Sequence, residues 1–152
     1  MPTSLNRALQ VRAADRLRDA LPRDETTGLP QLGGILEAQQ RELCEVGGGR
    51  LAAVAITADL DSMVEVARLL EPHVRRTDLL GVLDSEALLV LAPGLNPVGG
   101  QCLVDRLRDV LLFQQVEASV GIAYRCAASG TAWTTRALAA EAQQHAAEPL
   151  SA

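Results

Sequence analysis

The chain contains 152 residues, of which 48% are hydrophobic and 2% aromatic, and its formal net charge at pH 7 is −5. This length predicts a single domain whose core is built mainly from Leu, Val, Ile and Ala. The negative charge argues against non-specific binding to nucleic acid or to an anionic membrane surface. All 14 basic residues are arginines, which excludes any mechanism that depends on a lysine.

Three widely spaced cysteines, Cys44, Cys102 and Cys126, form no CxxC pair and no cluster with histidine, which disfavours a zinc site. We expect all three to be reduced and to pack on apolar faces as small hydrophobic side chains. No apolar run approaches the roughly 20 residues that span a bilayer, and no signal-peptide pattern opens the chain. These features predict a cytoplasmic protein.

The first 22 residues predict an amphipathic helix. Ser4 can cap it, and Pro22 stops it after Leu21. Its apolar stripe recurs every four residues and consists of Leu5, Leu9, Ala13, Leu17 and Leu21. The stripe can pack on its own domain or pair two copies of the chain. We therefore assign residues 1–22 as a candidate dimerisation segment, residues 23–147 as the main domain and residues 148–152 as a tail.

Apolar runs predict four strands, at residues 51–58, 79–83, 87–91 and 116–125. The second and third runs are separated only by Asp84-Ser85-Glu86, which indicates a β-hairpin, and we expect this hairpin at the centre of the sheet with the other two strands beside it. The runs are continuous rather than alternating, so both faces of the hairpin are expected to be covered. Helical periodicity predicts helices at residues 32–46, 63–74, from Asn96 or Pro97 to about Leu111, and 133–147.

Several short motifs follow one another in the order found in a known family. They are Thr27-Gly28-Leu29-Pro30, Arg75-x-x-Asp78, the hairpin closed by Pro93-Gly94, and Ser119-Val120-Gly121. Over about residues 24–147 the chain resembles GGDEF domains, the diguanylate cyclase family of bacterial signalling. The resemblance implies an α+β fold, the palm-like sandwich of nucleotide cyclases, with a central, mainly antiparallel sheet covered by helices.

The resemblance also implies that the fold is shortened after the first strand. Met63, Val66, Ala67 and Leu70 match the family helix that precedes the RxxD motif, so the segment with the base-reading loop is missing. Asp59-Leu60-Asp61 is then expected to be a helix N-terminus, where acidic residues favour the helix dipole. Asp59 and Glu86 remain as vestigial metal-binding candidates.

The family signature itself falls on Asp84-Ser85-Glu86-Ala87-Leu88. Both glycines are replaced, Glu86 retains the first acid, and Ala87 replaces the second. The resemblance implies that a cyclase holds divalent metal with two carboxylates, and an alanine cannot supply one. We predict no cyclase activity, no catalytic residue, no metal and no cofactor. The predicted function is a regulatory module that acts through protein contacts, with a protein partner or a second copy.

Arg75 and Asp78 support an alternative function. In the family they form an inhibitory site for cyclic di-GMP, in which arginine stacks on a purine and aspartate accepts guanine N–H groups. A receptor would need both side chains exposed on one surface, and the sequence offers no obvious second arginine cluster. The opposing interpretation is that Arg75 caps a helix end and Asp78 pairs with it or with Arg76. An active diguanylate cyclase is the remote alternative.

Overall fold

A four-stranded antiparallel sheet forms the centre of the protein, whose computed structural model describes residues 3–126 and 135–147. The strands are β1 (Arg50–Ala58), β2 (Leu79–Asp84), β3 (Ala87–Pro93) and β4 (Ala118–Cys126), in the spatial order β2-β3-β1-β4. Each boundary lies within two residues of the predicted one, so the strand predictions are confirmed. The hairpin is not central, however, because β2 forms one edge of the sheet.

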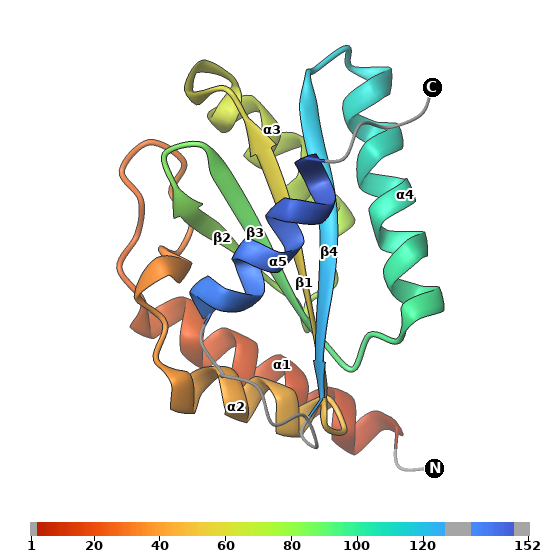
Figure 1. Cartoon of the computed structure of the whole chain (residues 1–152). Coiled ribbons are helices and arrows are strands. Elements are labelled where there is room, and N and C mark those ends of the chain that lie inside the picture. The colour runs from red at the N-terminus through yellow and green to blue at the C-terminus, as the bar shows by residue number, and fades with distance from the viewer. Residues whose placement is uncertain (1–2, 127–134, 148–152) are drawn as a thin grey trace.

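Helices cover both faces of this sheet, which confirms the α+β sandwich (Figure 1). The helices are α1 (Thr3–Ala20), α2 (Glu37–Val46), α3 (Met63–Leu70), α4 (Pro97–Phe113) and α5 (Thr135–Ala147). α3 and α4 pack on one face, whereas α5 crosses the other, and α1 and α2 lie together at the lower end in Figure 1. The predicted start of the last helix, Trp133, lies outside the described residues.

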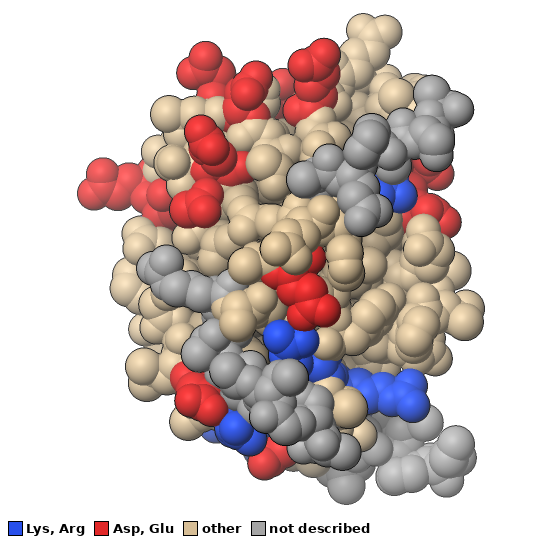
Figure 2. Space-filling model, viewed as in Figure 1, with Lys and Arg blue, Asp and Glu red and all other residues tan. Residues whose placement is uncertain are grey.

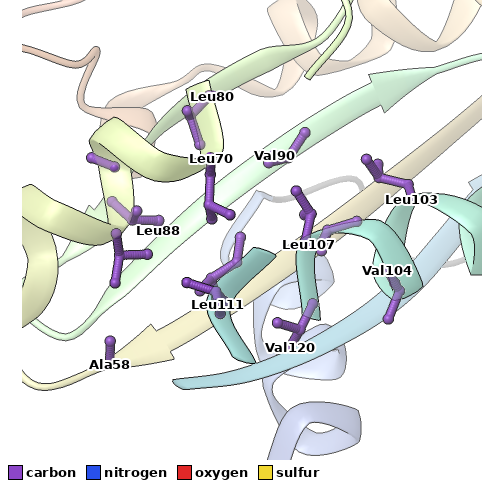
Figure 3. Close-up of a cluster of buried hydrophobic side chains, with 14 of the residues drawn as sticks. Ala58, Leu70, Leu80, Leu88, Val90, Leu103, Val104, Leu107, Leu111 and Val120 are labelled. Atoms are coloured by element: carbon purple, nitrogen blue, oxygen red, sulfur yellow. The ribbon is translucent and has the colours of Figure 1, made fainter. Parts of the chain in front are cut away.

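The core lies in two layers, one on each side of the sheet. Every residue of β3 is buried, as its continuous apolar run predicts. On the α3–α4 side, Leu70, Leu107 and Leu111 point towards the strand residues Leu88, Val90 and Val120 (Figure 3). Because both helices are anchored through this layer, their outer surfaces are held in a fixed relation to each other.

The outer edge of β2 is covered by the segment at Pro30. The Val82 N–H donates to the Pro30 carbonyl at 2.8 Å. Gly81 permits this approach, because a Cβ there would lie 2.4 Å from the Pro30 oxygen. The segment that follows therefore does not form one continuous helix from residue 32 as predicted. A 3₁₀ turn occupies Leu32–Gly34, and α2 begins only at Glu37.

The connection from β1 to α3 is short. β1 ends at Ala58, a 3₁₀ turn follows at Leu60–Ser62, and α3 begins at Met63. Asp59 thus lies at the entry to a helix, as predicted, although its side chain caps no backbone N–H. The predicted helix 63–74 is α-helical to Leu70 and continues as a 3₁₀ helix over Glu71–His73, because Pro72 cannot donate the next α-helical hydrogen bond.

α1 packs on its own domain. Ala13, Leu17 and Leu21 are buried in the layer formed with α2, and Gln10 Nε2 donates to the Val46 carbonyl at 2.9 Å. Leu9 is 44% exposed, and the side chain of Leu5 lies outside the described part of the chain. The stripe is therefore divided, with its C-terminal half already used within the domain.

The cysteines differ from one another, which corrects the prediction that all three are packed. Cys44 is buried, whereas Cys102 and Cys126 are exposed. Burial, with smaller effects of Cys126 and Glu45, raises the pKa of the Cys44 thiol. Among the described helices, none has the length and apolar character needed to cross a membrane.

Candidate functional site

The turn of the β2–β3 hairpin carries the residues on which the resemblance places the GGDEF signature. Asp84, Ser85 and Glu86 are exposed, and the Asp84 carboxylate accepts the Glu86 N–H at 2.9 Å. Ala87 is fully buried as the first residue of β3 and pairs with Thr57 of β1. The Ala58 N–H donates to the Glu86 carbonyl at 3.0 Å, which ties the turn to the end of β1.

An open cavity of about 530 Å³ adjoins this turn, and the charged residues that line it are all carboxylates: Asp59, Glu86 and Glu117. Figure 2 shows acidic side chains gathered at this upper end, where β1 ends and the hairpin turns. The structure thus brings the two vestigial metal candidates to one cavity. Sequence reasoning missed Glu117, because nothing in the local pattern before β4 distinguishes it from a solvated acid.

These carboxylates do not fit the divalent-metal site that the resemblance to cyclases implies. Glu86 is exposed at the turn, and Ala87 presents a buried methyl group where a second acid is implied. Within residues 3–126 and 135–147, no group of three or more His, Cys, Asp or Glu side chains is placed to hold a metal ion. Three neighbouring acids make the cavity electronegative, so an anionic ligand would be repelled.

The second candidate site is the turn between α3 and β2. The Asp78 side chain is completely buried, whereas that of Arg75 is 41% exposed. The Asp78 carboxylate accepts the Arg75 N–H at 2.8 Å and bonds the Arg75 guanidinium, with Nη2 to Oδ1 at 2.8 Å. Arg75 Nη2 also donates to the Pro93 carbonyl at 3.2 Å. Asp78 therefore pairs with Arg75 rather than with Arg76. A receptor would need both side chains exposed, and only that of Arg75 is.

Arginines from the N-terminal part of the chain join this turn. Arg18 of α1 donates through Nη2 to the Arg76 and Asp78 carbonyls, each at 2.7 Å, and pairs with Asp15. Arg23 Nη1 donates to the Gly28 carbonyl at 3.0 Å.

The arginines Arg18, Arg23, Arg75 and Arg76 line one cavity of about 240 Å³, together with Glu71 and Asp78. The expectation that no second arginine cluster exists is therefore wrong. Arg18 and Arg23 lie far from Arg75 in sequence, and only the docking of α1 brings them to the turn.

No protein-family profile and no curated protein sequence matches the chain. Solved structures do match. The FimX GGDEF domain from Pseudomonas aeruginosa superposes with a TM-score of 0.68 at 15% identity, over 82% of this chain and 92% of that one. The diguanylate cyclase SiaD from the same organism, in complex with its activator SiaC, gives 0.66 at 22% identity, over 94% of this chain and 62% of that one.

A third structure is a microbial GGDEF domain studied for its interaction with cyclic di-GMP. It gives a TM-score of 0.56 at 14% identity, over 85% of this chain and 86% of that one. Such low identities establish the fold alone. This protein has the fold of these GGDEF domains, as its motifs predict.

Proposed function

We propose that this GGDEF-like domain is catalytically inactive and acts as a regulatory module through protein–protein contacts. The observation that carries the proposal is the placement of Ala87. This residue takes the place of the second signature acid, and it is fully buried and paired with Thr57. Its methyl group can neither bind a metal ion nor accept a proton, so for a metal-assisted condensation of GTP the hairpin supplies only one of the two signature acids, Glu86.

The turn before Ala87 supports the same conclusion. A backbone N–H in a glycine turn can donate to a phosphate that lies close to the chain. In this turn the Glu86 N–H already donates to the Asp84 carboxylate. Asp84 adds a negative charge at that point, beside a cavity whose charged lining residues are also acidic. A triphosphate that brings no cation would therefore meet repulsion at this turn.

A calorimetric titration with GTP and Mg²⁺ tests this proposal. We expect no heat of binding for the wild type, because the cavity is acidic and the turn N–H is occupied. Glu86→Ala serves as the control. It removes one of the two candidate metal-binding carboxylates, Asp59 and Glu86, without changing the buried core. GTP binding by the wild type that disappears in Glu86→Ala would show that the cavity is a working nucleotide site.

A regulatory role through protein contacts has two supports. Large apolar side chains are exposed at one end of α3 and α4, including Leu112 and Phe113. The similar SiaD structure is a complex of a cyclase with its activator. Leu17 and Leu21 are buried within the domain and cannot pair two copies. Dimerisation through α1 therefore stays a prediction only for the exposed face of that helix around Leu9.

A cyclic di-GMP receptor is the second candidate function. The cavity lined by four arginines beside Arg75 and Asp78 favours it, because arginine suits both phosphate and guanine. A similar GGDEF domain has also been studied for its interaction with cyclic di-GMP. Binding would require guanine to compete for the Asp78 carboxylate, which Arg75 now occupies.

The same calorimetric experiment with cyclic di-GMP tests the receptor. If the cavity binds it, Arg75→Ala should weaken the affinity roughly tenfold to a hundredfold, the typical effect of losing a charge-assisted contact. Val98→Ala is the control that should leave the affinity unchanged, because Val98 is 75% exposed and does not line this cavity. A wild type that gives no heat with cyclic di-GMP removes this candidate.

A further inference from the structure

Exposed apolar side chains concentrate at one end of the α3–α4 layer. Of the large hydrophobic residues exposed within the described ranges, four belong to this region: Leu60, Val64, Leu112 and Phe113. Phe113 is the single phenylalanine of the chain, and it is 84% exposed. A group of exposed apolar side chains on one surface is typical of a protein interaction site.

A groove of about 520 Å³ runs between α3 and α4, and of these four residues Phe113 lines it. Its apolar walls are formed by Leu69 and Pro72 on one side and by Val110 and Phe113 on the other. The groove is preformed, because Leu70 and Leu111 anchor the two helices to the sheet (Figure 3). Arg106 Nη1 also donates to the His73 carbonyl at 3.2 Å and links the two walls.

The charges at the groove are self-complementary. Arg68 lies on the α3 side and Asp109 on the α4 side, and both are exposed. In the described part of the chain, neither forms an ion pair within 4.0 Å. A two-fold axis would set the α3 wall of one copy against the α4 wall of another, so each Arg68 would face an Asp109. Such reciprocal matching favours a second copy over an unrelated partner.

We propose that this groove binds the same groove of a second copy of the chain, with Phe113 of each copy inserted into the other. Two Arg68–Asp109 pairs flank the contact. The inference names a partner for the regulatory module and rests on the proposed function for its biological role. The contact itself is independent of nucleotide chemistry, so GTP binding would overturn the proposed function and leave the dimer unaffected.

Sedimentation equilibrium of the whole chain over a wide concentration range tests the contact. We expect the wild type to form a dimer, and Phe113→Glu to weaken it by about tenfold or more, since a central aromatic anchor carries much of an interface. Val98→Glu is the matched control, because Val98 is exposed at the other end of α4. A wild type that stays monomeric, or a dimer that Phe113→Glu leaves intact, overturns the proposal.

A charge exchange distinguishes this two-fold contact from any other dimer. Arg68→Asp alone and Asp109→Arg alone should each weaken the dimer, because each places like charges opposite one another. The double variant should restore it. A mixture of the two single variants should also form heterodimers, since each unlike pair is then regained. If both single variants dimerise as well as the wild type, or if the mixture does not associate, the two-fold pairing is wrong.

Discussion

Replacement of Leu17 by Asp is expected to destabilise the domain by about 4 kcal/mol or more. Leu17 is 4% exposed in the layer that joins α1 to α2 and the sheet. Truncating a buried leucine costs about 2–5 kcal/mol, and placing a carboxylate among apolar side chains adds a desolvation cost. Domains of this size have a total stability of about 5–15 kcal/mol, so the loss is a large fraction of it.

Leu9→Asp is the matched control for that prediction. It introduces the same charge on the same helix, but Leu9 is 44% exposed, so we expect a change within about 1 kcal/mol. Thermal denaturation followed by circular dichroism measures both variants, and hydrogen exchange over residues 3–20 shows whether α1 undocks. Equal melting temperatures for the two variants would contradict the packing of α1 on its own domain.

Arg75→Ala is expected to destabilise the domain by about 3 kcal/mol. The change leaves the Asp78 carboxylate, whose side chain is completely buried, without the guanidinium that it bonds at 2.8 Å. An ion left buried without its partner costs about 3–5 kcal/mol, and the Arg75 backbone N–H, which still donates to Asp78, favours the lower end. Asp78→Ala should cost less, because Arg75 is 41% exposed and can turn towards water.

Urea denaturation of the two single variants and of the double variant measures this coupling. The double variant should be more stable than the sum of the single losses implies, because neither partner is then left alone. Arg76→Ala, next to Arg75 but with an exposed side chain, should change stability by no more than about 0.5 kcal/mol. Strictly additive losses would mean that Arg75 and Asp78 do not act as a buried pair.

The strands and the RxxD pairing could be predicted because both are local features. Continuous apolar runs identify β1 and the hairpin, and a separation of three residues allows Arg75 and Asp78 to meet across one turn. The alanine at the position that the resemblance gives to the second signature acid can likewise be read from the hairpin residues, and the loss of that acid stays a prediction. The structure adds that Ala87 is buried, so the methyl group belongs to the core.

Features that depend on distant contacts could not be predicted. Arg18 donates to the carbonyls of Arg76 and Asp78, which lie 58 and 60 positions further along the chain, and no local pattern reveals those contacts. The predicted start of α2 is too early because Leu32 and Ile35 have helical spacing, although their segment follows the edge of β2. Val98 and Cys102 fit the periodicity of α4, yet both are exposed, and the buried positions begin at Gly100 and Leu103.

Product formation from GTP tests the central claim most directly. Purified protein, at a concentration where two copies can associate, is incubated with GTP and either Mg²⁺ or Mn²⁺, and cyclic di-GMP is measured by mass spectrometry. Because Ala87 replaces the second acid and the cavity at the hairpin is acidic, the account predicts no product above a control without protein. Cyclic di-GMP formation that Glu86→Ala abolishes would contradict it.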